Sequence, residues 1–250
     1  MSLTDQLARL GEVRAPASLL PAVMAAVGAA AGDQYGRTDD EVWPLWIAWN
    51  RDGVSAVMRA DDNDEAAFTA WFGREFERPL RRAESVPPAL KRSRRYDLKE
   101  LTPFERDVLL KTAQIPRGQV RTYGWVAREI GRPAAVRAVG TALANNPIPV
   151  LIPCHRVIRS DGIIGNYGAG GPDAKKEILS TEGVDPAEME RLAREGVRFF
   201  GSRTTHIFCM PTCRHARRVL PRYHVQFHSE AEARGKGFRP CKVCRPAAVA

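Results

Sequence analysis

Cys154 is the residue of this chain whose surroundings most directly indicate covalent chemistry. It lies in the run Ile-Pro-Cys-His-Arg-Val at residues 152–157, where a lone thiol is followed at once by His155. The thiolate is the nucleophilic form of cysteine, and a nearby imidazole can accept the thiol proton. Because adjacent side chains usually point apart, we expect this proton to pass through a bound water molecule. From these residues alone, a buried cysteine beside a packing histidine remains the alternative.

The remaining four of the five cysteines form two closely spaced pairs. They follow the pattern Cys209-x3-Cys213 and, 27 residues further on, Cys241-x2-Cys244. Four thiolates with this spacing can surround a Zn2+ ion in the tetrahedral arrangement that zinc prefers. The sequence therefore predicts a single zinc site with four cysteine ligands, and it gives no indication of an organic cofactor.

Positive charge is concentrated in the same cysteine-rich tail. The chain carries a formal net charge of +9. Residues 191–250 hold 13 Lys and Arg against 3 Asp and Glu, whereas the preceding 190 residues hold 25 against 26. An arginine-rich module that stays basic after binding zinc indicates a polyanionic partner such as nucleic acid. A basic tail without a specific partner is the alternative.

Composition and hydropathy favour a folded protein of the cytoplasm. Of the 250 residues, 44% are hydrophobic, which argues for packed cores. The sequence contains no apolar run of the length that spans a membrane, and its N-terminus lacks the basic and then apolar segments of a signal peptide. We therefore expect a cytoplasmic monomer without a membrane partner, in which cysteines bind metal or react rather than form disulfides.

Local patterns predict a β-hairpin and one helix in the first part of the chain. Tryptophan and aliphatic residues alternate within residues 41–57, and Gly53 breaks the run as a hairpin turn would. Aromatic residues recur on one face of residues 66–76, as in an amphipathic helix. The basic, proline-containing stretch at 84–95 has the composition of a linker.

Helix signals become sharper after this linker. Thr102, Pro103 and Glu105 form the capping box and first turn of a helix. Two short helices at 122–130 and 134–144, separated by Gly-Arg-Pro, predict a helix-turn-helix. A helical hairpin that binds nothing is the alternative to that interpretation.

Taken together, these motifs resemble the O6-alkylguanine-DNA alkyltransferase family over roughly residues 40 to 200. The order and spacing of the series are specific to that family. After Tyr167 the chain contains a longer glycine-rich loop than is usual in it, which leaves the range of alkyl adducts open. Besides Pro-Cys-His-Arg-Val, the matching segments are 102–105 (Thr-Pro-Phe-Glu), 118–123 (Gly-Gln-Val-Arg-Thr-Tyr), 136–140 (Val-Arg-Ala-Val-Gly), 146–147 (Asn-Pro), 165–167 (Gly-Asn-Tyr), 176–179 (Lys-Glu-Ile-Leu) and 182–183 (Glu-Gly).

The resemblance implies a fold class of three parts. An α/β N-terminal subdomain with its linker would span residues 41–95, after a segment 1–40 to which we assign no role. A mainly helical alkyltransferase subdomain at 96–198 would carry the catalytic site and a DNA-binding helix-turn-helix, which in this family grips DNA from the minor groove. A small four-cysteine zinc module at 199–250 would complete the chain.

The resemblance also assigns catalytic roles to individual side chains. Cys154 would attack the alkyl carbon on guanine O6 and keep the alkyl group as a thioether. Glu182 would orient His155, which takes the thiol proton. Asn146 would brace the active-site turn, and Tyr123 would donate to guanine N3 and crowd the rotated phosphate.

Further residues match positions that contact DNA or the extruded base. Arg137 would fill the space that the flipped base leaves in the stack, because flipping disrupts stacking and pairing. Ser160 would contact phosphate. Val157, Tyr167 and Gly168 would line the base pocket.

The tail resembles the zinc module of the Ada protein that repairs methylphosphotriesters. The match implies that Cys209 is a second methyl acceptor, while a purely structural zinc site that helps to hold DNA is the alternative. Since so short a module has little core of its own, we expect metal removal to unfold it without inactivating Cys154. The matching segments are 203–209 (Arg-Thr-Thr-His-Ile-Phe-Cys), 211–213 (Pro-Thr-Cys) and 237–246 (Gly-Phe-Arg-Pro-Cys-Lys-Val-Cys-Arg-Pro).

The function implied by both resemblances is DNA repair by direct, single-turnover alkyl transfer. The substrate would be O6-alkylguanine in duplex DNA, with O4-alkylthymine as a further candidate. Two alternatives remain: a lesion sensor that does not transfer, and a zinc-dependent transcription regulator. Cys154 argues against the first, and the lack of a separate sequence-reading domain in the sequence argues against the second.

Overall fold

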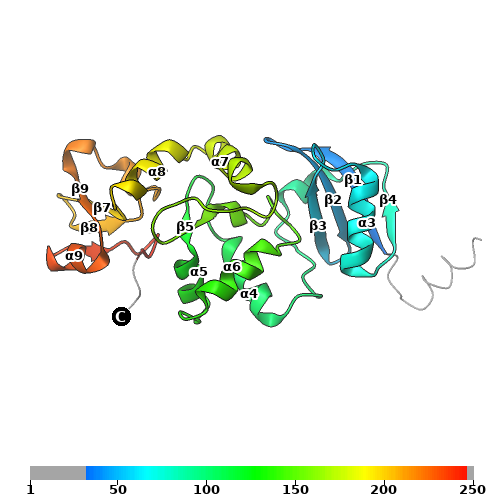
Figure 1. Ribbon diagram of the computed structural model, residues 1–250, viewed down its shortest axis with the longest axis horizontal. Helices are drawn as coiled ribbons and strands as arrows, with labels where there is room; N and C mark the ends of the chain where they lie inside the picture. The colour runs from blue at the N-terminus through cyan, green and yellow to red at the C-terminus, as the bar shows by residue number, and fades with distance from the viewer. Residues whose placement is uncertain (1–31, 247–250) are drawn as a thin grey trace, which may run out of the picture.

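The computed structural model describes residues 32–246, and these form three parts along an elongated molecule (Figure 1). An N-terminal sheet with one helix is followed by a mainly helical middle part and then by a small C-terminal sheet. Residues 1–31 of the predicted segment 1–40 lie outside the described residues. Within the described range, no helix combines the length and apolar character that crossing a membrane requires.

The N-terminal sheet contains β1 (Asp33–Asp39), β2 (Pro44–Asn50), β3 (Gly53–Arg59) and β4 (Leu80–Arg82). Their order in the sheet is β3-β2-β1-β4. The hairpin predicted within residues 41–57 is confirmed, because β2 and β3 pair antiparallel on either side of the turn. Gly53 has a φ of 143°, which favours glycine at this turn. Strand β1 lies inside segment 1–40, so the sheet starts earlier than residue 41.

Helix α3 (Glu65–Phe76) packs on one face of this sheet (Figure 1). It begins where Asp64 accepts a hydrogen bond from the Ala67 backbone N–H, and it confirms the helix predicted at 66–76. Phe68 and Phe72 are fully buried against residues of the strands, among them Trp46. The alternate positions of β2 belong instead to the buried cluster of the middle part, so the sheet is covered on both sides; they are Leu45, Ile47 and Trp49.

The middle part holds the helices around Cys154. Its helix α4 (Pro103–Thr112) starts with the predicted capping box: Thr102 Oγ1 accepts from Glu105 N, and the Glu105 carboxylate accepts from Thr102 N. A 3-10 helix, η1 (Pro88–Arg92), precedes it in the linker region. The other elements are β5 (Arg121–Thr122), α5 (Tyr123–Glu129), α6 (Val136–Ala144), the 3-10 helix η2 (Cys154–Arg156), β6 (Val157–Ile158), α7 (Gly171–Thr181) and α8 (Pro186–Arg194).

Helices α5 and α6 correspond to the pair predicted at 122–130 and 134–144. Thr122 caps α5 by accepting a hydrogen bond from Trp125 N, and Gly131 ends it with a φ of 72°. The second helix starts two residues later than predicted, at Val136. Residues 133–134 form a turn before the helix, closed by a hydrogen bond from the Ala135 backbone N–H to Arg132 O.

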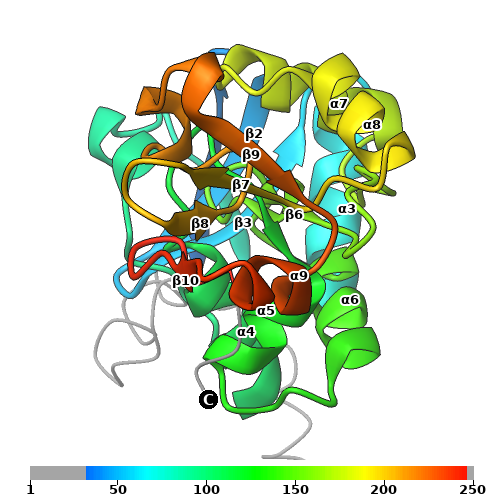
Figure 2. The same ribbon diagram turned by 90° about the vertical axis from the view of Figure 1, so that its left-hand side faces the viewer.

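The C-terminal part is a second four-stranded sheet, in which β7 lies between β8 and β9 (Figure 2). Phe208 and Phe227 are fully buried and pack with Phe238 into a small core. The elements are β7 (Phe199–Ser202), β8 (Ile207–Cys209), the 3-10 helices η3 (Ala216–Arg218) and η4 (Pro221–Tyr223), β9 (His224–Phe227), α9 (Glu230–Gly235) and β10 (Arg239–Pro240).

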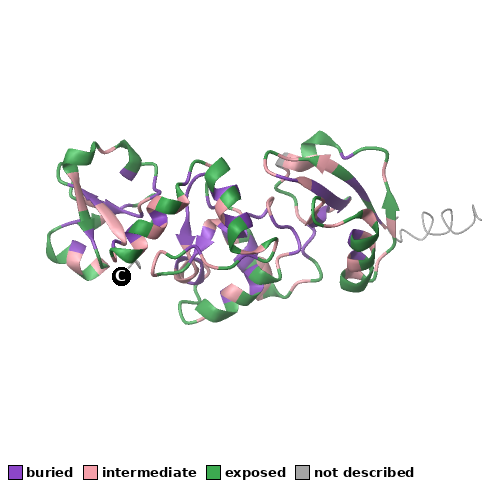
Figure 3. Cartoon of the chain, turned by 45° about the horizontal axis from the view of Figure 1, so that its top comes forward, coloured by how far each residue is buried: buried purple, intermediate pink, exposed green. Residues whose placement is uncertain are grey.

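The C-terminal sheet is joined to the middle part by a shared core. All four cysteines of the tail are buried in the same apolar cluster as Trp125 of α5. Buried residues accordingly lie in the centre of the middle part and also in the C-terminal part (Figure 3). This continuity gives a physical reason to revise the expectation that the tail unfolds independently of Cys154.

Gly201→Ala should destabilise the C-terminal part by overfilling its core. A Cβ at Gly201 would lie 2.5 Å from a Phe227 ring atom and 2.7 Å from a Phe238 ring atom. Overpacking of this kind typically costs about 1–3 kcal/mol. The matched control is Gly235→Ala in α9, where an added Cβ meets nothing within 4 Å. Urea denaturation should show lower stability for the first variant only, and equal midpoints would contradict this packing.

Candidate active site and metal centre

Cys154 is held at the end of a buried turn by Asn146. The Asn146 side-chain N–H group donates to Cys154 Sγ over 3.1 Å and to Ile152 O over 3.0 Å. Its side-chain oxygen accepts from Ile148 N at 3.0 Å, so one side chain ties the turn together. Val150 within the turn has a φ of 71°, a conformation that non-glycine residues rarely adopt. The turn therefore depends on Asn146 for its shape.

One ring nitrogen of His155 is held by Glu182. His155 Nε2 lies 3.1 Å from Glu182 Oε1, and the ring is fully buried. Nε2–H donates to the ionised carboxylate, so Nδ1 carries the lone pair. Among the described residues, Nδ1 is buried without a hydrogen-bond partner. This nitrogen is thus available to accept a proton.

Glu182 accepts several hydrogen bonds besides the one from His155. Arg156 Nε donates to Oε2 at 2.8 Å, Arg156 Nη2 donates to Oε1 at 2.6 Å, and Gly118 N donates to Oε2 at 3.3 Å. Burial opposes ionisation of Glu182, but hydrogen bonds from His155 and Arg156 outweigh it and lower its pKa to about 2. The carboxylate is therefore charged throughout the physiological range.

The thiol and the imidazole are both neutral at rest. Burial raises the pKa of Cys154, although the Asn146 hydrogen bond and the nearby Lys175 charge act in the opposite direction. Burial lowers the pKa of His155, against the effect of Glu182. A neutral imidazole can accept the proton of a thiol, and the thiolate that forms is the nucleophilic species.

Lys175 and Arg156 were not singled out by the sequence analysis. Lys175 is 1% exposed and donates from Nζ to Val157 O at 2.6 Å and to Asn166 O at 3.2 Å. Burial lowers its pKa to about 8. The available signal was its place on the apolar face of α7 beside Ala174. Arg156 lies in the quoted motif, but no pattern indicated its bidentate contact.

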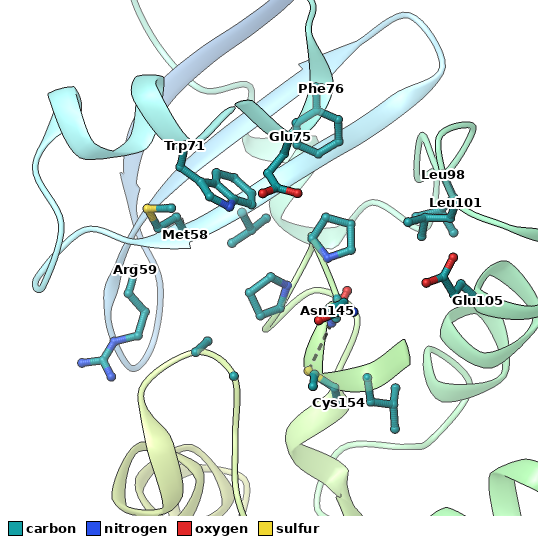
Figure 4. A pocket seen from close by; sticks show the side chains of 18 of the residues that line it. Met58, Arg59, Trp71, Glu75, Phe76, Leu98, Leu101, Glu105, Asn145 and Cys154 are labelled. Carbon is teal, nitrogen blue, oxygen red and sulfur yellow. Dashed lines mark hydrogen bonds between the residues drawn. The ribbon is translucent and has the colours of Figure 1, made fainter. Parts of the chain in front are cut away.

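Cys154 borders two cavities. The smaller, of about 220 Å3, is lined by Tyr123, Tyr167, Gly168 and residues of α6. The larger, of about 660 Å3, extends from Cys154 to the N-terminal part, where Met58, Trp71 and Phe76 face it (Figure 4). The thiol thus lies where two volumes meet.

Some of the residues predicted to contact the base or DNA lie away from the small cavity beside Cys154. Val157 is fully buried and does not line the small cavity; its carbonyl instead accepts the Lys175 hydrogen bond. Ser160 is exposed and lines a different cavity, between the middle and C-terminal parts. Arg137 is exposed near the start of α6. Tyr123, the first residue of α5, reaches the small cavity.

The four tail cysteines converge on one point. Their Sγ atoms all lie within 4.8 Å of one another, and all four residues are buried. A tetrahedral zinc ion with bonds of about 2.3 Å places its sulfur ligands ~3.8 Å apart, so the cluster fits zinc. Hydrogen bonds among the neighbouring thiols raise the pKa of Cys209 and lower that of Cys213, which shows how closely the sulfur atoms approach one another.

Two family models match the chain. One, described as the DNA-binding domain of 6-O-methylguanine DNA methyltransferase, matches residues 103–184. The other, described as the metal-binding domain of Ada, matches residues 189–247. The first range contains Cys154 and Glu182, and the second contains all four clustered cysteines.

Curated relatives carry the name methylated-DNA–protein-cysteine methyltransferase. One from Methanosarcina acetivorans is 35% identical over 156 residues, which cover 60% of this chain and 97% of the relative. One from Rattus norvegicus is 40% identical over 136 residues, covering 54% of this chain and 61% of the relative. The chain spans 54% of the length of the Homo sapiens relative that it matches.

Solved structures similar to the chain include O6-methylguanine methyltransferases. That of Pyrococcus kodakaraensis gives a TM-score of 0.49 at 26% identity, covering 61% of this chain and 99% of that one. That of Mycobacterium tuberculosis gives a TM-score of 0.47 at 28% identity, covering 60% and 92%. From the sequence relatives, the chain belongs to the methylated-DNA–protein-cysteine methyltransferase family, and it carries an Ada-type metal-binding domain.

Glu182→Gln should reduce the acid sensitivity of folding. Since the folded pKa of Glu182 is about 2, below its ordinary 4.5, its stabilising effect is complete above about pH 4.5 and is lost as the pH falls toward 2. The stability difference between wild type and variant should therefore shrink over this window. Urea denaturation between pH ~2 and ~6 measures it.

The control for this series is Glu84→Gln, at an exposed position. That variant should lose stability in parallel with the wild type on acidification. If Glu182→Gln and the wild type also ran in parallel, the contacts of the carboxylate with His155 and Arg156 would not stabilise its charged form.

Proposed function

We propose that this protein repairs DNA by transferring the alkyl group of O6-alkylguanine to Cys154. The observation that carries this proposal is the series of contacts from Asn146 to the thiol and from His155 to Glu182, placed at the edge of a cavity. A thiol, a neutral base and a buried orienting carboxylate are the groups that an activated cysteine nucleophile requires. O4-alkylthymine is a further candidate substrate.

The reaction follows from the protonation states of these groups. His155 Nδ1 takes the proton of Cys154 through a water molecule, and Glu182 stabilises the resulting imidazolium. The thiolate attacks the alkyl carbon, and the bond from this carbon to guanine O6 breaks. The electron pair of that bond stays on guanine, which leaves as its N1 anion or is protonated as it leaves. The thioether is stable and the other cysteines lie in the four-cysteine cluster, so each molecule acts once.

DNA binding would use the α5–α6 pair as a helix-turn-helix. Arg137 is exposed at the start of α6, and Tyr123 links α5 to the small cavity, which suits a base that leaves the duplex beside them. Ser160 and the basic tail would contact phosphates. The partner is alkylated duplex DNA, and we infer a monomer with the predicted parts 41–95, 96–198 and 199–250, the first of them extended at its N-terminal side to include β1.

The C-terminal module would hold one zinc ion on its four cysteines. When bound, zinc keeps thiolates deprotonated and nucleophilic near neutral pH. We infer that Cys209 can accept a methyl group from a backbone phosphotriester. A cavity of about 300 Å3 borders Cys209 and is rimmed by Arg239 and Lys242, whose charges suit a phosphate backbone.

Cys154→Ala should lose transfer and keep most DNA affinity, because the thiolate supplies the bonding electrons and the grip comes from helices and phosphate contacts. Intact mass after incubation with duplex O6-methylguanine DNA should show one added methyl group on the wild type and none on the variant. With phosphotriester-containing DNA, peptide mapping should place a methyl group on Cys209 in both proteins. A methyl group gained by the variant from O6-methylguanine would contradict the assignment.

Arg137→Ala should slow transfer from duplex DNA by about tenfold or more and leave transfer from free O6-benzylguanine unchanged. An arginine that replaces the flipped base in the stack matters only when a base must leave a duplex. The matched control is Arg74→Ala, an exposed arginine on α3, outside the α5–α6 pair. Equal losses on duplex DNA and on the free base would point to a pocket or folding defect instead.

A further inference from the structure

Residues 115–121, which we call the bridging loop, contact the Cys154 site on one side. Gly118 N donates to Glu182 Oε2 at 3.3 Å, and Ile115 O accepts from Arg156 Nη1 at 2.6 Å. Gly118 has a φ of 72°, and an added Cβ would lie 2.7 Å from Glu182 O. Gly118 of the bridging loop is thus in close contact with Glu182, the residue that orients His155.

The same loop contacts the metal-binding module on its other side. Gly118 O accepts from Arg217 Nη2 at 2.7 Å, and Val120 N donates to Thr212 Oγ1 at 2.9 Å. Thr212 lies between Cys209 and Cys213, inside the first metal-binding pair. The Arg217 backbone N–H bonds to Cys213 O at 3.1 Å. Thr212 and Arg217, which make these two contacts, are therefore both tied to the backbone of the first cysteine pair.

The second cysteine pair supports helix α5. Trp125 Nε1 donates to Cys244 O at 3.1 Å in a buried contact, and Arg245 forms an ion pair with Glu129. Helix α5 begins with Tyr123, which lines the small cavity beside Cys154. The module thus contacts the catalytic part at two places, once through each cysteine pair.

Metal binding would decide whether these contacts persist. Four buried thiolates without a cation repel one another, and a module with so small a core depends on its metal to fold. Loss of the metal would therefore displace Thr212 and the Cys244 carbonyl together. The bridging loop would then lose its hydrogen bonds on the side away from Glu182.

We propose that the metal-binding module is an internal support of the Cys154 site, in which Arg217 and Thr212 act as positioning residues for Glu182 through the bridging loop. Gly118 is the link, because its N–H bonds to the Glu182 carboxylate and its carbonyl to Arg217. This inference rests on the proposed transfer at Cys154 for its kinetic readout. Its structural readout, protection of the bridging loop, is independent of that function.

The first experiment compares Arg217→Ala with Arg218→Ala. Within the described range the Arg218 side chain is exposed and makes no hydrogen bond or ion pair, so it controls for loss of charge. Arg217→Ala should lower the rate constant for free O6-benzylguanine about three- to tenfold, since partners of an orienting group affect rate through that group. Free base as substrate removes the contribution of DNA binding. Arg218→Ala should match the wild type.

Two further readouts distinguish positioning from general stability. Amide hydrogen exchange of residues 115–121 and 178–184 should speed up in Arg217→Ala and in chelator-treated protein whose metal loss is measured. The rate constant should also change its pH dependence, because His155 is faced by Glu182, Arg156 and Lys175 and loses part of the orientation that Glu182 gives. Thr212→Val should behave like Arg217→Ala, whereas Thr212→Ser should keep the acceptor and behave like the wild type.

The outcomes separate this inference from the proposed function. If the wild type transfers the benzyl group and Arg217→Ala equals Arg218→Ala in rate and in exchange, the inference is wrong and the function stands. If the wild type does not transfer, the proposed function fails, and the exchange of residues 115–121 after metal loss alone decides the coupling. Unchanged exchange in metal-free protein overturns it, and faster exchange supports it.

Discussion

The hydrogen bonds of the buried Glu182 carboxylate hold together the segments that surround Cys154. The carboxylate holds the His155 ring, pairs with Arg156 and accepts the Gly118 backbone N–H, so three segments distant in sequence meet at one charged group. A buried charge is tolerable only when hydrogen-bonded on all sides. The same contacts that keep Glu182 ionised also fix the tautomer of His155. The network that stabilises the buried charge is thus the same one that, in the proposed function, activates Cys154.

Each of the three parts of the chain contributes differently to the surroundings of Cys154 and Glu182. The N-terminal sheet closes the large cavity next to Cys154, and the middle part provides the thiol, the base and the carboxylate. The C-terminal module contacts the bridging loop behind Glu182 and packs its cysteines against Trp125. Parts that follow one another in the sequence therefore share a continuous core in space, and for this reason we infer that loss of the metal affects the Cys154 site.

Sequence patterns predicted the local features and the residues with distinctive chemistry. The hairpin around Gly53 and the capping box at Thr102 follow from short-range rules, and the tail cysteines follow from ligand spacing. Long-range partners could not be derived in this way. The burial of Lys175 and the docking of Arg217 on Gly118 depend on which surfaces meet, and no single-segment pattern encodes that. Val157 does not line the small cavity, because motif position does not determine on which side of a turn a side chain lies.

In the proposed function, Glu182 holds His155 as the neutral Nε2–H tautomer, so that Nδ1 can receive the Cys154 proton. Nitrogen-15 NMR of the His155 ring over a pH series tests this directly. At neutral pH we expect a proton on Nε2 and none on Nδ1, and we expect the pKa of His155 to lie below the ordinary 6.5 because burial disfavours the cation. A proton on Nδ1 alone, or an imidazolium at neutral pH, would contradict it.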